Sequence, residues 1–353
     1  MRFPPLCLIA LCALFLCGCG VVKKMLARVY ISKGHVCVRK GMHEDAIGRF
    51  TKAIEILPGF AKAYIARADA YIEINKPDKA VEDCSKALEL EPDNIPAYVS
   101  RGMAHMAASR PKRAMEDCGK AVSLEPKSAQ AHLCLGNVYF ASAEMENALQ
   151  EFDEAVALKP DYGQAYNNRA EVYKKLRNRK KAEDGFNKAI SLNCAKAYYN
   201  RALGYPCHTW VSMARGMDPN EFLFMQQKLR QACPMAIDDL TRAVSIKPRF
   251  AMAYYRRAKA FLALLDFDPA LDDFTQAVAL DDRFSNALFM RGYTHRKKSA
   301  WIKYKLADDP EFKEYDSSSI DLNLKKALSD YRQACELGHK GGCAAADEIK
   351  SGT

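Results

Sequence analysis

The sequence of 353 residues lacks an apolar run long enough to cross a membrane. Its N-terminal apolar run, residues 6–16, is eleven residues long, about half of what a helix needs to span a hydrocarbon core of about 30 Å. Arg2 precedes this run and small residues follow it. A charged start, a short apolar middle and a small-residue end are typical of a secretory signal that is removed. We therefore expect an exported protein.

The sequence also lacks the short motifs of common enzyme classes. It has no G-x-x-x-x-G-K loop, no H-E-x-x-H and no G-x-S-x-G. Its few histidines are scattered without paired carboxylates: His35, His43, His105, His132, His208, His295 and His339. We therefore predict a protein that is not an enzyme, with no cofactor, no metal and no small-molecule substrate.

The composition is that of a globular chain with excess positive charge. Hydrophobic residues make up 49% of the sequence and the net charge is +10, enough apolar material for one or two cores. Such a charge can indicate nucleic-acid binding, but an exported protein meets no nucleic acid. Anionic lipid headgroups, an acidic partner or a merely solvated surface remain as explanations.

A pattern recurs along the chain every 34 residues. AKAYIARA at 61–68 corresponds to IPAYVSRG at 95–102, and EDCSKA at 82–87 to EDCGKA at 116–121. Extending the period gives eight units, which begin near residues 27, 61, 95, 129, 163, 195, 251 and 285. The first small position is Gly34, Ala68, Gly102, Gly136, Ala170, Ala202, Ala258 and Gly292; alanine recurs at two further positions, beginning with Ala46 and Ala53.

The small residues predict pairs of closely packed antiparallel helices. Two helices approach to about 8 Å only where the side chains at their crossing are small. Large residues such as Tyr64 and Phe152 fill the space beside the crossing. Prolines end the second helix of most units: Pro58, Pro92, Pro126, Pro160 and Pro248. A repeated helix pair of this length predicts an all-α solenoid.

These features resemble the tetratricopeptide repeat (TPR) over residues 27–337. The resemblance implies a right-handed superhelical solenoid of about eight helix–turn–helix repeats. Units 1–5 occupy 27–194, and unit 7 occupies 251–284. Unit 6 (195–250) contains an insertion near 206–231, and unit 8 (285–340) contains another near 298–320. Residues 341–353 form a C-terminal cap.

The resemblance also implies a concave groove that binds a protein or an extended peptide. One position of the first helices usually faces this groove in the family: Ile31, Ile65, Val99, Leu133, Asn167, Tyr199, Tyr255 and Phe289. The groove is therefore expected to be apolar and to become aromatic toward its C-terminal end. The lysine, asparagine and arginine clamp of co-chaperones that grip a carboxylate is absent. Packing between units is the alternative role for this row.

A row of arginines is expected to form internal ion pairs rather than to bind a ligand. It comprises Arg67, Arg101, Arg169, Arg201, Arg257 and Arg291. The second helices supply matching acids: Asp83, Asp117, Glu151, Asp239, Asp273 and Asp330.

The end of the leader resembles the lipobox of bacterial lipoproteins. Leu16-Cys17-Gly18-Cys19 places a small residue before Cys19, whereas a bulky leucine precedes Cys17. We therefore expect a signal peptide at 1–18, lipidation of Cys19 and a linker at 19–26. Gly20 is not the aspartate that retains lipoproteins in the inner membrane, so the resemblance favours a periplasm-facing position at the outer membrane.

Several later cysteines are candidates for disulfides. The segment from Cys335 to Cys343 resembles the bridged repeats of secreted cysteine-rich solenoids, although Cys335, His339 and Cys343 also have the spacing of metal ligands. Cys207 and Cys233 bracket the first insertion and form a second candidate pair. Cys84 and Cys118 occupy equivalent positions in neighbouring units, too far apart to bridge each other, and we interpret them as core thiols.

Both insertions lie between the two helices of a unit and are rich in aromatic residues. A short amphipathic helix is expected from 219 to about 232, because Asp218-Pro219 is typical of a helix start. Trp210, Phe222, Phe224 and Trp301 are predicted to form a docking surface for another protein. Packing of the insertions onto each other is the alternative.

The sequence thus predicts a lipid-anchored scaffold of the bacterial envelope that binds other proteins. Such a scaffold serves the assembly of envelope complexes, pili or secretion systems. Two alternatives remain: an accessory regulator of a cell-wall or envelope enzyme, and a soluble cytosolic TPR scaffold with a misinterpreted N-terminus.

Overall fold

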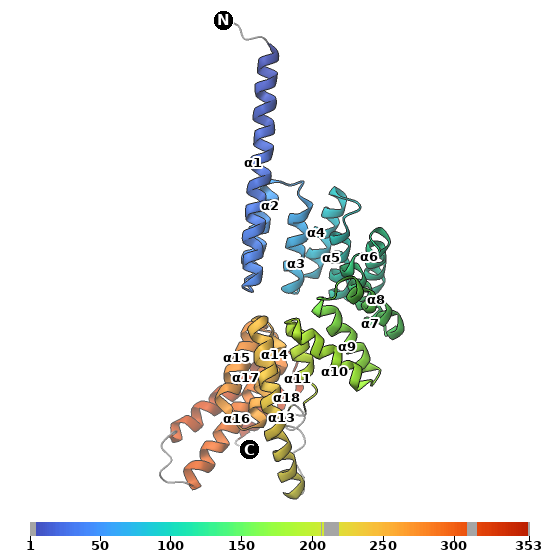
Figure 1. Cartoon of the computed structure of the whole chain (residues 1–353). Helices are drawn as coiled ribbons and strands as arrows, with labels where there is room; N and C mark the ends of the chain where they lie inside the picture. Colours follow the sequence, from blue (N-terminus) through green and yellow to red (C-terminus); the bar gives the residue numbers. More distant parts are fainter. Residues whose placement is uncertain (1–4, 206, 208–218, 309–315, 352–353) are drawn as a thin grey trace. The chain divides into compact units, whose positions relative to one another are not determined.

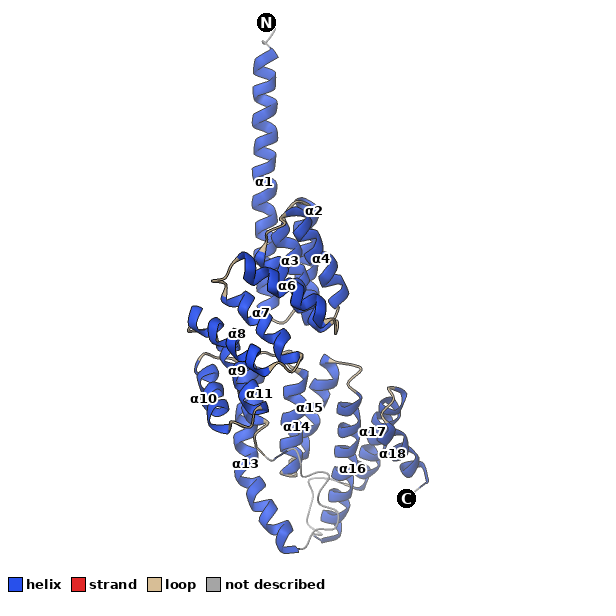
Figure 2. Ribbon diagram, turned by 90° about the vertical axis from the view of Figure 1, so that its right-hand side faces the viewer, coloured by secondary structure: helices blue, strands red, loops and turns tan. Residues whose placement is uncertain are grey.

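The computed structural model describes residues 5–205, 207, 219–308 and 316–351. Regular secondary structure in these ranges is helical throughout, with helices joined by short turns (Figure 2). The chain divides into two compact units, Met1–Leu192 and Asn193–Thr353. Each unit is described by itself.

The first unit consists of five helix pairs (Figure 1). In chain order they are α1 (Pro5–Arg39) and α2 (His43–Ile56), α3 (Ala61–Glu73) and α4 (Pro77–Leu90), α5 (Ile95–Ala107) and α6 (Pro111–Leu124), α7 (Ala129–Ala141) and α8 (Met145–Leu158), and α9 (Gly163–Lys175) and α10 (Arg179–Ser191). Both helices of a pair pack together, and each first helix also contacts the next first helix. The first helices therefore form one layer of the solenoid.

The second unit contains three further helix pairs and a last helix. The pairs are α11 (Ala195–Ala202) and α13 (Pro219–Ile246), α14 (Ala251–Ala263) and α15 (Phe267–Leu280), and α16 (Ser285–Asp308) and α17 (Ser317–Glu336). The last helix, α18 (Lys340–Ser351), packs against α17. This order confirms the all-helical repeat fold that the 34-residue period predicts.

Both insertions lengthen helices in the residues that the structure describes. We expected a short helix that ends near residue 232, but α13 runs on without a break through Pro234. Leu229, Cys233, Ala236 and Leu240 are all buried and follow one another at helical spacing. This continuous apolar stripe holds the helix together across the proline. In the second insertion, residues 298–308 extend α16 and 317–320 begin α17; residues 206, 208–218 and 309–315 lie outside the described ranges.

The small residues of the repeat lie where the two helices of a pair cross. A methyl group added to Gly34 would come within 2.3 Å of the Phe50 ring, and one added to Gly136 within 2.6 Å of Phe152. At Gly292 the same group would lie 3.0 Å from Tyr331. Atoms this close overlap, so the large residue of the second helix occupies the space that the glycine leaves.

The arginine row forms internal pairs, as the sequence predicts. In five units the guanidinium group donates two hydrogen bonds of 2.6 to 3.0 Å to one aspartate: Arg67–Asp83, Arg101–Asp117, Arg201–Asp239, Arg257–Asp273 and Arg291–Asp330. Arg169 also forms an internal pair, with Asp153 at 2.6 Å, whereas Glu151, one of the predicted acids, binds His132 at 2.7 Å.

The same arginines also connect neighbouring units. The remaining guanidinium nitrogen of Arg67 donates to the hydroxyl of Thr51 at 3.0 Å, and that of Arg257 donates to Thr241 at 3.0 Å. Both hydroxyls belong to the second helix of the preceding unit. One side chain therefore sets the packing within its own unit and the angle to the unit before it.

Replacing Gly136 with alanine is expected to destabilise the first unit. The added methyl group overlaps the Phe152 ring, and such overpacking costs about 1–3 kcal/mol. The matched control is Gly119→Ala in α6, where an added methyl group meets no atom within 4 Å and alanine improves helix propensity by up to about 1 kcal/mol. Chemical denaturation followed by circular dichroism measures both changes. Equal denaturation midpoints for the two variants would contradict the crossing constraint.

Candidate functional site

The row of residues predicted to face the groove lies largely in the interior. In the first unit Val99, Leu133 and Asn167 are buried, with at most 4% of their surface exposed, and Ile65 is 9% exposed. Ile31 is half-buried against the cluster around Phe50. Leu133 nevertheless lines the cavity described below, whereas Ile31, Ile65, Val99 and Asn167 do not, so the alternative role in packing between units applies to these four.

The aromatic members of the row in the second unit are half-buried and packed against other rings. Tyr199 lies with its ring 4.9 Å from that of Phe250, and Tyr255 lies 4.9 Å from Phe284. Phe289 is stacked on His339 at 4.3 Å, in the turn before α18. These rings join successive helices, so they do not form the open aromatic end of a groove.

The surface of the first unit is hollowed one helical turn further along the same helices. A cavity of about 290 Å³ is lined by residues of α1, α3, α5, α7 and α9. Four of these residues follow the predicted row by four positions: His35, Asp69, Met103 and Asn137. The 34-residue period locates these positions equally well, but a period alone does not say which turn of the helix faces the open side.

Polar side chains link the first helices across this cavity. Ser100 of α5 donates a hydrogen bond of 2.7 Å to Asp69 of α3. In the same way the amide of Asn168 in α9 donates to Asn137 of α7 at 2.6 Å, and Asn167 donates to Asn168 at 2.9 Å. The lining of the first unit is therefore mixed, because apolar residues such as Val38, Ile72 and Leu133 share it with hydroxyl, amide and carboxylate groups.

Asp69 is the most perturbed group of the cavity. Desolvation in the hollow raises its pKa from 3.8 to about 6; the nearby Glu73 raises it further, and the hydrogen bond from Ser100 opposes the change. The side chain still has access to water. No lysine or arginine occurs among the described residues that line the cavity. The local field therefore favours the binding of a positive charge.

The predicted docking surface of the insertions is not assembled in the described part of the chain. Trp301 lies in α16 with its ring 6.0 Å from that of Phe267, in the core of the second unit. Trp210 and the side chains of Phe222 and Phe224 lie outside the described residues. Trp301 thus has a packing role within its own unit.

Two disulfides are present among the described residues. Cys335 and Cys343 are joined, the pair that the resemblance to bridged repeats favours, and the bond ties the end of α17 to α18. A metal site at Cys335, His339 and Cys343 is therefore wrong, and the described residues contain no cluster of three or more potential metal ligands. Cys207 and Cys233 are free thiols buried in one cluster. Their mutual hydrogen bond lowers the pKa of Cys207 and raises that of Cys233.

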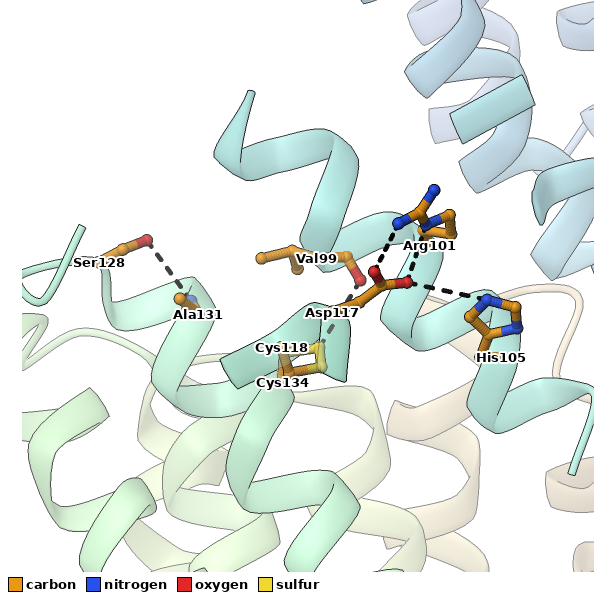
Figure 3. The surroundings of a disulfide bond; sticks show 8 residues. All are labelled: Val99, Arg101, His105, Asp117, Cys118, Ser128, Ala131 and Cys134. Atoms are coloured by element: carbon orange, nitrogen blue, oxygen red, sulfur yellow. Dashed lines mark hydrogen bonds and ion pairs between the residues drawn. A yellow bond between two sulfur atoms is a disulfide. The ribbon is translucent and has the colours of Figure 1, made fainter. Parts of the chain in front are cut away.

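The second disulfide joins Cys118 to Cys134 (Figure 3). The prediction that Cys118 is a core thiol is wrong, because Cys134, unlike the equivalent Cys84, lies close enough to bridge it. Cys134 belongs to the first helix of the next unit, and both sulfur atoms fill the space beside Gly102. The bond therefore links α6 to α7 across the boundary between two units, next to the Arg101–Asp117 pair.

The N-terminal region is helical in the structure. Residues 20–26, expected to be a linker, continue α1 without a break. The side chain of Cys19 lies outside the described residues. In the described part of the chain, none of the helices has the length and apolar character that a membrane span requires.

Comparisons with known proteins identify the repeat. Tetratricopeptide repeat models match residues 61–94 and 163–193, and a TPR repeat model matches residues 136–176. The segments 61–94 and 136–193 therefore match tetratricopeptide repeats. A comparison with curated protein sequences finds no significant match.

A solved structure supports the same fold. Cut9 in the APC/C hetero-tetramer Cut9–Hcn1 is similar with a TM-score of 0.55 and 12% identity, over 91% of this chain and 55% of that chain. This likeness shows the fold alone, and this chain spans about half of that structure. The crystal structure of MamA matches at 25% identity and TM-score 0.36, over 47% of this chain and 97% of its own. The Arabidopsis OM64 TPR domain matches at 28% identity and TM-score 0.32, over 34% of this chain and 98% of its own.

Asp69 is expected to make stability depend on pH. Its pKa rises from 3.8 to about 6 on folding, so the folded state binds the proton more tightly than the unfolded state. Stability therefore falls as pH rises through this window. Asp69→Asn should remove this loss of stability. As pH rises to about 6, the variant should therefore become more stable relative to the parent chain. Denaturation midpoints across this range measure the gain. Asp93→Asn, in the exposed turn before α5, is the control; the same gain there would contradict the assignment.

Proposed function

We propose that the protein is a non-enzymatic scaffold whose first unit binds an extended segment of a partner protein. The observation that supports this proposal is the cavity of the first helices around Asp69, whose lining combines apolar and polar side chains. TPR proteins hold other proteins through surfaces of this kind, and the shared fold supports the same general role here.

The chemistry of the lining supports an extended peptide as the ligand. An extended backbone has unpaired N–H and C=O groups along both edges. Gln130 and Gln164 line the cavity and are exposed, and each amide side chain both donates and accepts hydrogen bonds. Asp69 and Glu73 add negative charge on one side. We propose that the bound segment places a lysine or arginine next to Asp69.

We further propose that the scaffold is held in the bacterial envelope by a lipid on Cys19, facing the periplasm and more consistent with the outer than the inner membrane. The leader and the lipobox resemblance support this location. The Cys118–Cys134 and Cys335–Cys343 disulfides are consistent with it, because disulfides persist in oxidising compartments. A lipid-anchored scaffold with a peptide groove would serve the assembly of an envelope complex, a pilus or a secretion system.

Peptide selection tests the groove. Selection of a random-peptide library on the purified chain is expected to enrich sequences that contain lysine or arginine. Asp69→Asn removes the charge without changing the shape, and it should weaken binding of an enriched peptide by about tenfold, the effect of losing one charged hydrogen bond. Asp93→Asn is the matched control and should bind like the parent chain. Enrichment of peptides that bind all three proteins equally would contradict the assignment.

Palmitate labelling tests the anchor. The parent chain is expected to incorporate labelled palmitate and to accumulate as a longer precursor in the presence of globomycin, because only a lipoprotein precursor requires the globomycin-sensitive peptidase. Cys19→Ala should abolish the label, whereas Cys17→Ala, two residues earlier, should retain it. Membrane attachment and labelling that persist in Cys19→Ala would disprove the anchor.

A further inference from the structure

Exposed apolar side chains are concentrated on one helix of the molecule. In α1 the side chains of Val21, Met25, Val29 and Val36 are 66%, 70%, 40% and 39% exposed. Val22 and Leu26 widen the same face. Elsewhere in the described residues the exposed large hydrophobic side chains are more scattered, for example Leu90, Leu158, Leu176 and Leu265.

This face points away from the rest of the first unit. With a rotation of 100° per residue, Val21, Met25, Val29 and Val36 lie within one quarter of the helix circumference. Ala27 and Gly34 are buried on the opposite side, where α1 packs against the following helices. Terminal units of solenoids normally present a polar outer face to water, so an apolar stripe here needs a partner.

Positive charge is concentrated on the same helix. Residues 1–43 contain no aspartate or glutamate. From residue 20 onward this stretch contains six basic residues, which account for more than half of the net charge of +10: Lys23, Lys24, Arg28, Lys33, Arg39 and Lys40. In the helical projection Arg28 and Lys33 lie on opposite borders of the apolar stripe. An apolar stripe with basic borders is the pattern of a helix that lies in a membrane interface.

We propose that the outer face of α1, from Val21 to Val36, lies flat on the surface of a bilayer that contains anionic lipids. The apolar side chains enter the boundary of the acyl chains, and the basic side chains bind the headgroup phosphates. This inference deepens the proposed membrane location and does not depend on the peptide groove.

Other occupants fit this face less well. A second copy of the chain would place one basic stripe against another, and like charges oppose such contact. An acidic protein would match the charge, but interface centres are rich in aromatic residues, and the exposed large hydrophobic residues of this face are valine, leucine and methionine. Binding to an anionic bilayer requires only that the helix has an apolar stripe with positively charged residues on its borders.

Lipid cross-linking separates a flat helix from a simple tether. Val36 lies 17 residues after Cys19, about 25 Å along the helix, so an anchor at the N-terminus alone does not bring it to the lipid. The full chain is prepared with photoreactive benzoylphenylalanine in place of Val36, or in place of Leu158 of α8 as the control. These two apolar side chains are 39% and 38% exposed. Each protein is bound to vesicles of phosphatidylglycerol and phosphatidylcholine, and the floated chains are irradiated.

Among the floated chains, the probe at position 36 is expected to yield at least about fivefold more lipid adduct than the probe at position 158. Lys33→Gln should lower the adduct yield at position 36 by about fivefold, because that is the effect of one basic residue at an anionic surface. Vesicles of phosphatidylcholine alone should lower it as well. Flotation measures whether the chain binds the vesicles, and the adduct ratio measures whether the outer face of α1 contacts the lipid. Failure of the proposed membrane location can therefore be distinguished from failure of the proposed helix orientation. Equal adducts at both positions would overturn the proposal, as would cross-links between chains or, in cells, to another protein.

Discussion

The close crossing of the two helices in each unit is the constraint on which the rest of the structure depends. At Gly34 and Gly136 the aromatic ring of the second helix occupies the volume of the missing side chain. This contact fixes the distance between the helices, and the Arg67–Asp83 type of pair then fixes their rotation. The same arginine also donates a hydrogen bond to a hydroxyl of the preceding unit, so the orientation of one unit depends on that of the unit before it. The curvature of the first-helix layer, and with it the cavity, follows from these repeated contacts.

The sequence predicts most of this framework because the framework is periodic. Small residues, arginines and aspartates recur at the same position in successive units, so each is supported by its equivalents. The cavity depends on which helical turn faces the open side, and a shift from Val99 to Met103 leaves the period unchanged. The Cys118–Cys134 bond and the unbroken α13 were missed for a related reason. Each depends on one contact that does not recur in the other units.

The cavity and the outer face of α1 place opposite charges on one unit. Asp69 and Glu73 make the cavity negative, although the chain as a whole has a net charge of +10. The basic residues of α1 are drawn from the first forty-three residues, which contain no acid. A basic segment of a partner is therefore attracted to the cavity and repelled by the helix that carries the apolar stripe. The two surfaces do not compete for one ligand.

The Cys118–Cys134 bond has a consequence for how the first unit opens. Solenoids unfold by fraying, one repeat at a time from either end, because each repeat contacts only its neighbours. A covalent link between α6 and α7 prevents separation at that boundary. Cys134 also lines the cavity, on the same helix as Asn137. A ligand bound there therefore contacts a repeat boundary that a covalent bond keeps closed even when the repeats at the ends open.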